Sequence, residues 1–309
     1  MMQIAAVVVT YNRCTLLMQC IEHIHAQKLP AGVSLDVLVV DNASTDDTLY
    51  SLTTFIEDGT VRYYNTGSNL GGAGGFAFGM RVAVEAGYDL LWIMDDDCLP
   101  SATALEKLLE AGDTVGEWGF LSSVVKWTDG SICAMNVQRH PLFNNIEDFS
   151  PDVQPASLAS FVSLLVPAAV VRDVGLPHAE FFIWTDDWEF TRRISRKYPC
   201  YVVGTSQVVH ASQTNSPGNI FTDSEERLGR YAYIYRNDVV LYREEGLRGH
   251  LYLWVRAIYH SLRVLLSDVN LKRERIDLIW KGTKEGFNFH PMTVFPEPAD
   301  GEVDECNSN

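Results

Sequence analysis

The sequence predicts an α/β protein with a mostly parallel β-sheet and a helical C-terminal region. Over the first hundred residues, short β-branched apolar runs alternate with segments of helical spacing, which is typical of a parallel sheet covered on both faces. Apolar residues make up 47% of the 309 residues, enough to bury a substantial core. The fold class follows from these two observations.

The first half is predicted as an unbroken alternation of strand and helix. Each strand is a short apolar run, and the predicted strands span residues 4–10, 35–42, 61–66 and 88–96. Apolar residues near helical spacing predict helices at residues 13–27 and 44–56. Residues 71–87 read as a glycine-rich loop running into a third helix.

The second half carries weaker signals, and its elements are predicted from shorter patterns. They are strands at 119–127 and 159–167, a long loop at 136–157, an aromatic strand end and then a helix within 180–199, a strand pair at 200–212 and helices over 224–267. Residues 295–309 form an acidic tail that we expect to be disordered.

The composition excludes several classes of protein. A formal net charge of −16 argues against a nucleic-acid binder, since polyanions would be repelled. The six cysteines are scattered without a CxxC pair, which indicates reduced thiols rather than a disulfide framework. The N-terminal apolar run reads as a buried strand rather than a signal peptide, and no segment approaches the ~20 apolar residues of a membrane span. We therefore expect a soluble, cytoplasmic protein.

Polar residues follow each of the first four predicted strands. They are Thr10 to Arg13, Asp41 and Asn42, Asn65 to Asn69, and Asp95 to Asp97. Because the carboxyl ends of parallel strands meet at one edge of a sheet, where ligands bind, these groups are expected to converge there. The convergence predicts a binding site.

The three consecutive aspartates suit a hard divalent cation. In an extended segment alternate side chains point the same way, so Asp95 and Asp97 can share Mg²⁺ or Mn²⁺ while Asp96 faces elsewhere. Without a metal, these carboxylates are expected to have raised proton affinity. The alternative is a solvated turn that caps a helix beginning near Ser101.

A second acidic cluster, Asp186, Asp187 and Glu189, is flanked by Trp184 and Trp188. A carboxylate at a helix N-terminus beside aromatic rings can act as general base for a hydroxyl group, and the rings can stack on a sugar. The alternative is that the aspartates only cap the helix and complement its dipole.

Two other features are ambiguous by themselves. A single histidine at a strand end, such as His210, is more often a hydrogen-bonded structural group than a metal ligand. The "NLGGAGGF" segment lets the backbone approach a ligand closely, but it fits neither a dinucleotide fingerprint nor a P-loop.

Taken in order, these motifs resemble the inverting family 2 glycosyltransferases of the GT-A fold, a Rossmann-like fold of nucleotide-diphospho-sugar transferases. The resemblance rests on the segments "VVVTYNR", "VLVVDNASTDDT", "NLGGAGGFAFGM", "WIMDDDCLP", "FFIWTDDWEFTRRI" and the histidine of "VVHAS". They span Val7 to His210, and together they most resemble bacterial galactofuranosyltransferases. Rhamnosyltransferase-like members share much of this pattern, so transfer from dTDP-rhamnose is the alternative.

The resemblance implies a role for each motif. Asp187 would be the catalytic base, with Asp186 and Glu189 as supporting or acceptor-binding carboxylates and Trp184 and Trp188 beside the acceptor. Asp95, Asp97 and His210 would hold Mn²⁺ or Mg²⁺. The nucleotide sugar, with galactofuranose from UDP-galactofuranose preferred, would contact Thr10, Asn12, Arg13, Asp41, Asn69, Gly72 and Asp96.

We also expect the chain to divide into parts. Residues 1–215 would be the catalytic domain, with a nucleotide-binding half at 1–100 and an acceptor-binding half at 101–215. A helical region at 216–294 would follow, outside the part that carries the resemblance. The large N-terminal β domain of polymerising galactofuranosyltransferases is absent, and so is the QxxRW motif of processive synthases. We therefore expect transfer of one or a few sugars to a glycan or lipid-linked acceptor.

Two other functions are compatible with parts of this pattern. A nucleotidyltransferase shares the sheet and paired aspartates, but "TYNRCTLL" lacks its glycine- and arginine-rich loop. A non-catalytic sugar-binding protein of the same fold would not need both acidic clusters. The C-terminal helices, rich in Tyr, Trp, Leu and Arg, are expected to pack on the catalytic domain or form a homo-oligomer face, or else to lie peripherally on the inner face of the cell membrane.

Overall fold

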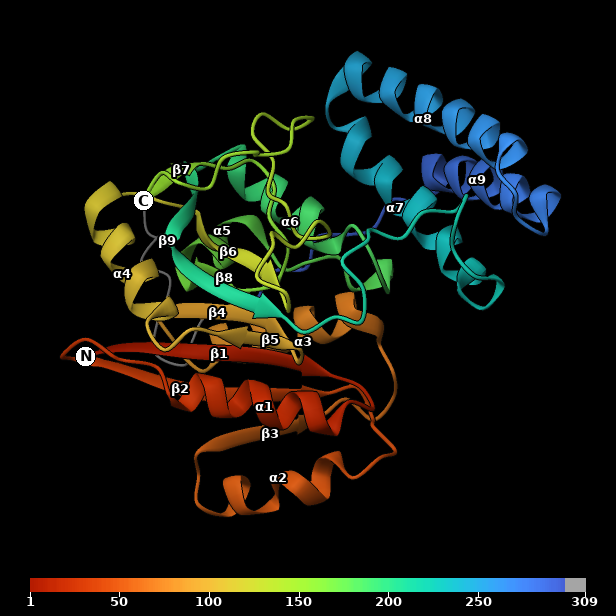
Figure 1. Cartoon of the computed structure of the whole chain (residues 1–309). Helices are drawn as coiled ribbons and strands as arrows, with labels where there is room; N and C mark the ends of the chain where they lie inside the picture. The colour runs from red at the N-terminus through yellow and green to blue at the C-terminus, as the bar shows by residue number, and fades with distance from the viewer. Residues whose placement is uncertain (298–309) are drawn as a thin grey trace, which may run out of the picture.

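A computed structural model of the chain describes residues 1–297, and its centre is a nine-stranded sheet with helices on both faces (Figure 1). The strands are β1 (Met2–Thr10), β2 (Val33–Asp41), β3 (Val61–Asn65), β4 (Leu90–Asp95), β5 (Cys98–Pro100), β6 (Phe120–Trp127), β7 (Val153–Pro155), β8 (Leu164–Pro167) and β9 (Cys200–His210). The predicted α/β class is confirmed.

The helices connect these strands or follow them. They are α1 (Cys14–His25), α2 (Thr48–Glu57), α3 (Gly71–Glu85), α4 (Ala104–Val115), α5 (Ala168–Val174), α6 (Asp186–Ser195), α7 (Tyr231–Arg243), α8 (Gly246–Leu266) and α9 (Lys272–Asn288), with short 3₁₀ helices η1 (Ala179–Phe181) and η2 (Glu225–Arg230).

The sheet is parallel in its first half and mixed in its second. Its strand order is β3-β2-β1-β4-β8-β6-β9-β5, with β7 paired to β9. The pairs among β3, β2, β1 and β4 are all parallel, whereas β8 is antiparallel to both β4 and β6. The carboxyl ends of the first four strands therefore share one edge.

Both faces of the sheet are buried, which explains the continuous apolar run of β1. Val7 belongs to the core beneath α3, α5 and α6, and Val8 belongs to the core beneath α1 and α4. Neither valine is exposed to solvent. Burying each such side chain contributes roughly 1.5–3 kcal/mol to folding.

The glycine-rich segment is helical rather than a loop that precedes a helix. An added Cβ at Gly75 would lie 2.6 Å from Val9 Cγ1, and one at Gly79 would lie 2.5 Å from Val7 Cγ1. These glycines therefore allow α3 to pack closely on β1. The predicted loop is wrong. Glycine is common in turns, but in this segment it is required for close packing of a helix on a strand.

Two predictions for the second half are also wrong. Residues 200–212 do not form a strand pair, because β9 continues through an irregularity in which the register against β6 jumps from Val203 to Gln207. Residues 180–185 do not end a strand, because Phe182, Trp184 and Thr185 have left-handed backbone conformations, with φ between 65° and 70°.

Helices α7, α8 and α9 pack together at one side of the sheet, where Figure 1 draws them in blue. They enclose a core of their own that includes Tyr235, Ala257 and Ile279. Within residues 1–297, no helix is both long enough and apolar enough to span a bilayer. The domain boundaries at residues 215 and 294 stay predictions.

Of the predicted acidic tail, residues 298–309 lie outside the described residues. The described part contacts the body of the protein. The amide of Glu297 donates to Glu85 Oε1 at 3.3 Å, and just before it the carbonyl of Val294 accepts from the amide of Leu176 at 2.8 Å.

Gly71 provides a test of how α3 meets the segment before α6. Its φ is +72°, and an added Cβ would lie 2.0 Å from the carbonyl oxygen of Phe182. We expect Gly71→Ala to lower the free energy of unfolding by roughly 3 kcal/mol, measured by denaturant titration. The control is Gly72→Ala, because an added Cβ there meets nothing within 4 Å. Equal effects of the two substitutions would contradict this account.

Candidate active site

The parallel register aligns the polar strand ends. Thr10 pairs with Asp41, Asp41 pairs with Asn65, and Val9 pairs with Asp95. One row across the sheet edge therefore contains the ends of β1, β2, β3 and β4. The convergence expected from the sequence is confirmed.

Arg13 and Thr10 contact the aspartates that follow β4. Arg13 Nη1 lies 2.7 Å from Asp97 Oδ2 and 3.2 Å from Asp96 Oδ1, and Thr10 Oγ1 donates to Asp96 Oδ2 at 2.7 Å. Burial nonetheless raises the pKa of Asp96 to about 7, although Arg13 and Thr10 act to lower it. Burial and the charge of Asp97 raise the pKa of Asp95 to about 6.

His210, at the end of β9, faces Asp97. Its Nδ1 donates to Asn136 Oδ1 at 2.7 Å, an arrangement that directs Nε2 towards Asp97 Oδ1 at 3.1 Å. Burial acts to lower the pKa of His210, but the contacts with Asp97 and Cys133 raise it to about 10. Burial would likewise raise the pKa of Asp97, yet His210 and Arg13 hold it below its usual range.

The same pair can be tested as metal ligands. Asp97 Oδ1 is buried and has no well-directed hydrogen bond from any described residue, despite the nearby Nε2. With Nδ1 protonated, the lone pairs of Nε2 and Oδ1 face each other, so a proton or a cation is required between them. A histidine oriented by its second nitrogen is typical of metal sites. Asp97 and His210 therefore fit a cation.

A complete protein cage for a metal is not formed. Among residues 1–297, no three or more His, Cys, Asp and Glu side chains are arranged to hold an ion. Mg²⁺ is often bound by one or two carboxylates with substrate phosphates and water completing its coordination. The ligand set predicted from the sequence, with Asp95 as third member, is therefore not assembled by the side chains alone.

Asp41 is buried and has both oxygens engaged. Oδ1 accepts from the amide of Ser44 at 2.8 Å, and Oδ2 accepts from the Tyr63 hydroxyl at 2.6 Å. Burial and this hydrogen bond raise the pKa of Tyr63 to about 12. A base bound at Asp41 would have to share these acceptors or displace Tyr63.

The other residues expected along the nucleotide sugar line the same edge. Asn12 Oδ1 accepts from the amide of Thr45 at 2.7 Å, which ties the loop after β1 to the loop after β2. Asn69 Oδ1 accepts from the amide of Gly71 at 2.8 Å. Gly72 faces open space, since an added Cβ there would meet nothing within 4 Å.

Asp186 and Asp187 begin α6, with Thr185 before them at the N-cap. Burial raises the pKa of Asp186 to about 7, and the charge of Glu189 adds to this. Burial and the neighbouring Asp186 raise the pKa of Asp187 well above its usual range, and Asp95 contributes as well. The start of α6 therefore lies within electrostatic reach of Asp95, the last residue of β4.

Glu189 differs from its two neighbours. Arg193 donates from Nε and Nη2 to its two oxygens at 3.1 and 2.8 Å, and His178 Nε2 lies 3.6 Å away. Burial opposes ionisation of Glu189, but His178 and Arg193 lower its pKa to about 2. Both oxygens of Glu189 are engaged in this ion pair, and its supporting or acceptor-binding role stays a prediction.

The two tryptophans are also engaged within the protein. The Trp184 ring lies 5.2 Å from that of Tyr231, and the Arg139 guanidinium lies 4.0 Å from the centre of the Trp188 ring. Stacking of Trp188 on an acceptor sugar would compete with Arg139. The acceptor-binding roles of both residues stay predictions.

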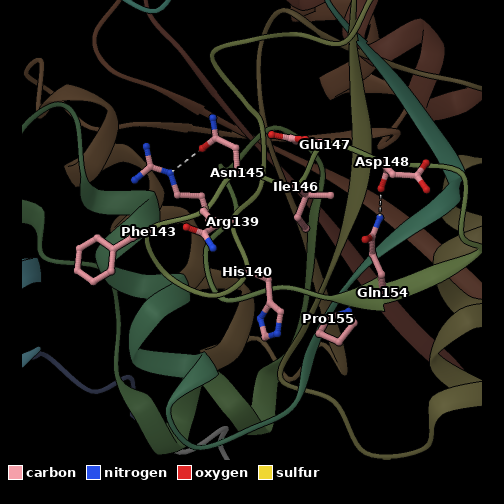
Figure 2. A pocket seen from close by; sticks show the side chains of 10 residues that line it. Arg139, His140, Phe143, Asn145, Ile146, Glu147, Asp148, Gln154 and Pro155 are labelled. Atoms are coloured by element: carbon pink, nitrogen blue, oxygen red, sulfur yellow. Dashed lines mark hydrogen bonds between the residues drawn. The ribbon is translucent and has the colours of Figure 1, made fainter.

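A cavity of about 850 Å³ opens elsewhere, in the long loop between β6 and β8 (Figure 2). Arg139, His140, Phe143 and Asp148 are part of its lining, and Figure 2 shows Arg139 donating to Asn145, which also lines it. In the described part of the chain, none of the predicted site residues lines it. The cavity is therefore separate from the sheet-edge site.

The sequence reasoning missed the residues that orient the site. Tyr63 contacts Asp41, Asn136 orients His210, and Asn237 and Asp238 of α7 contact the segment before Asp186. For the α7 pair a signal existed, because two buried polar residues interrupt an otherwise apolar face of a helix.

Comparison with known proteins shows what the chain is similar to. Residues 5–132 match the model of glycosyl transferase family 2. Galactofuranosyltransferase GlfT1 of Mycolicibacterium smegmatis is 30% identical over 305 residues, covering 92% of this chain and 97% of the relative. GlfT1 of Mycobacterium tuberculosis is 26% identical, covering 79% of this chain and 83% of the relative.

Solved structures agree on the fold. The crystal structure of S. aureus TarS in complex with UDP covers 93% of this chain and 72% of its own, with a TM-score of 0.53 and 15% identity. GalNAc-T7, solved with UDP, GalNAc and Mn²⁺, covers 93% of this chain and 56% of its own, with a TM-score of 0.63 and 14% identity. At this level of identity, both establish the GT-A fold alone.

The ion pair of Glu189 leads to a pH-dependent prediction. Its pKa in the folded state, about 2, lies below the usual value of 4.5, so its contribution to stability is present above pH 4.5 and is lost as pH falls towards 2. We expect Glu189→Gln to lower the free energy of unfolding by roughly 3 kcal/mol at pH 7. Urea titrations at pH 7 and pH 3.5 measure this, and a difference that does not shrink at low pH would contradict it.

Proposed function

This chain belongs to glycosyl transferase family 2, and from that premise we propose that it moves galactofuranose from UDP-galactofuranose to a hydroxyl of a glycan or lipid-linked acceptor. The choice of sugar is supported by the galactofuranosyltransferase that is 30% identical over 92% of this chain. The observation that carries the transfer chemistry is the aspartate pair at the start of α6, within electrostatic reach of Asp95.

In this proposal Asp187 is the general base. Its carboxylate takes the proton of the acceptor hydroxyl, whose oxygen attacks the anomeric carbon as the bond to the diphosphate breaks. One displacement inverts the configuration at that carbon. The raised pKa of Asp187 supports this role, because a carboxylate withdrawn from water accepts a proton more readily. Asp186, beside it, keeps that proton affinity high.

The donor would lie along the sheet edge. Asp41 would accept from the ring N–H of the uracil, and Thr10, Asn12 and Asn69 would line the path towards Asp96. Gly72 supports this path, since it leaves open space beside the backbone of α3. Arg13 adds a positive charge where a diphosphate would reach Asp96 and Asp97.

Asp97 and His210 would hold Mn²⁺ or Mg²⁺, with Asp95 close by. When bound, such a cation neutralises charge that develops on a leaving diphosphate. The poorly partnered Oδ1 of Asp97 supports this assignment, because a cation would satisfy it. Arg13, which pairs with the other oxygen of Asp97, would keep that carboxylate oriented.

A thermal-shift panel tests the donor and the metal together. We expect UDP-galactofuranose with Mn²⁺ to raise the melting temperature by roughly 5 °C at saturation, and we expect the shift to vanish with chelator or in Asp97→Ala.

Asp187→Asn should keep the shift but lower kcat by roughly 10²–10⁴, measured as UDP release with a panel of octyl glycosides as acceptors.

The controls separate the alternatives. A larger shift with dTDP-rhamnose than with UDP-galactofuranose would replace the proposed sugar. Loss of turnover in Asp186→Asn but not in Asp187→Asn would move the base by one residue. If no nucleotide sugar shifts the protein under any metal condition, the sheet-edge site is not a donor site.

We also propose that α8 lies on the inner face of an anionic membrane. Nine large apolar side chains are exposed on this one helix, whereas exposed apolar residues are usually scattered singly. They are Leu247, Leu251, Trp254, Val255, Ile258, Tyr259, Leu262, Leu265 and Leu266. Their spacing of three or four residues forms one continuous stripe along the helix.

The charge of α8 favours a lipid surface over a second copy of the chain. The protein has a net charge of −16, yet residues 246–266 contain no Asp or Glu and include the exposed Arg248 and Arg263. An apolar stripe bordered by arginine, with Trp254 and Tyr259 among its members, is typical of helices that lie in the membrane interface. This arrangement would bring the site to a lipid-linked acceptor.

Co-sedimentation with lipid vesicles tests the membrane proposal. We expect the wild type to bind vesicles that contain phosphatidylglycerol, and we expect the double variant Ile258→Glu, Leu262→Glu to bind at least tenfold more weakly, since two charges would enter the interface. Tyr50→Glu is the matched control, because Tyr50 is 82% exposed on α2. Light scattering that finds a dimer, dissociated by the double variant and without vesicle binding, would instead assign the stripe to self-association.

A further inference from the structure

The segment that precedes the aspartate pair has an unfavourable backbone conformation. Phe182, Trp184 and Thr185 have φ values of 65°, 66° and 70°, in the left-handed region that bulky and β-branched residues rarely adopt. Such a conformation persists only where surrounding contacts hold it. The contacts that hold this one come from α7 and α3.

Asn237 of α7 provides a dense set of these contacts. Its side chain is fully buried, and Nδ2 donates to the carbonyl oxygens of Phe181 at 3.1 Å, Ile183 at 3.1 Å and Trp184 at 2.9 Å. Arg236 Nε donates to Asn237 Oδ1 at 3.0 Å, which directs Nδ2 towards the segment. The two hydrogens of one amide group are therefore shared among three carbonyls of the strained turn.

Asp238, the next residue of α7, extends these contacts to the start of α6. Thr185 Oγ1 donates to Asp238 Oδ1 at 2.6 Å, and Asp238 is paired on its other side with Arg256 of α8. On the opposite side of the segment, the amide of Ala73 in α3 donates to the carbonyl of Phe182 at 3.2 Å. The segment is thus held between the C-terminal helices and the sheet domain.

We propose that Asn237 and Asp238 are positioning residues that hold Asp186 and Asp187 in the orientation needed for catalysis. The inference rests on the proposed function, since it concerns the base of that reaction. It assigns the C-terminal helices a role in the chemistry beyond packing. Their buried polar groups contact Thr185, the residue immediately before Asp186.

The chemistry of α7 argues against a purely packing role. A buried amide is costly unless its hydrogen bonds are made, so an apolar residue would serve packing at least as well. The same helix packs through Tyr235 and Val239, which are almost fully buried. The polar groups of Asn237 and Asp238 instead form hydrogen bonds with the turn before α6. Displacing a catalytic group by about 1 Å can lower the rate by ~10²-fold.

The experiment compares Asn237→Leu with the matched control Tyr235→Phe. Tyr235→Phe removes one hydrogen bond between α7 and α8, to His260, without touching the segment. We expect Asn237→Leu to lower kcat roughly 10- to 100-fold in the UDP-release assay while the thermal shift with UDP and Mn²⁺ is unchanged. Hydrogen exchange at residues 181–187 should accelerate at least tenfold. Tyr235→Phe should change neither quantity.

A second pair of variants guards against misfolding of Asn237→Leu. Thr185→Ser keeps the hydroxyl that donates to Asp238, whereas Thr185→Val removes it at nearly the same volume. We expect Thr185→Val to lose kcat and Thr185→Ser to retain it, with UDP affinity equal in both. Loss in both variants, or in neither, would overturn the role of Asp238.

The readouts distinguish failure of this inference from failure of the proposed function. Unchanged hydrogen exchange in Asn237→Leu would overturn the positioning role whatever the activity. Accelerated exchange with unchanged kcat would also overturn it, because the segment would then be loosened without any effect on the base. If the wild type itself transfers no sugar from any donor, the proposed function fails, and with it the catalytic meaning of the segment.

Discussion

Electrostatic repulsion among carboxylates at one edge of the sheet is the constraint around which the protein is arranged. Asp95 ends β4, Asp96 and Asp97 follow it, and the start of α6 adds two further aspartates that interact with the charge of Asp95. Water is largely excluded, so each charge is costly. The pKa values of Asp95 and Asp96 are accordingly raised, and only the strong contacts of Asp97 lower its pKa.

The compensating groups come from distant parts of the chain. Thr10 ends β1 and Arg13 follows it, His210 ends β9, and Asn136, which orients His210, lies in the loop after β6. Their contacts bring the ends of β1, β4 and β9 together at one point. A divalent cation bound with a diphosphate would reinforce the same balance, because it adds positive charge where the carboxylates are least well paired.

Many features of the site could be predicted from the sequence because they depend on local order along the chain. The four strand-end motifs and the alternation of strand and helix require only periodicity and the geometry of a parallel sheet. Glu189 illustrates the limit. Its position next to Asp186 and Asp187 suggested a supporting or acceptor-binding role, but the sequence did not show that Arg193 and His178 approach its oxygens in the folded protein.

The sequence by itself therefore determined the α/β class, the edge at which polar groups converge and the motifs of a family 2 glycosyltransferase. Only the tertiary structure decided which carboxylates are paired and which are left with raised pKa values. It also decided that the glycines of α3 serve close packing on β1 and that Asn237 of α7 holds the turn before α6. The reason is physical: burial, ion pairing and backbone strain depend on contacts between residues far apart in the chain, and no local pattern records those contacts.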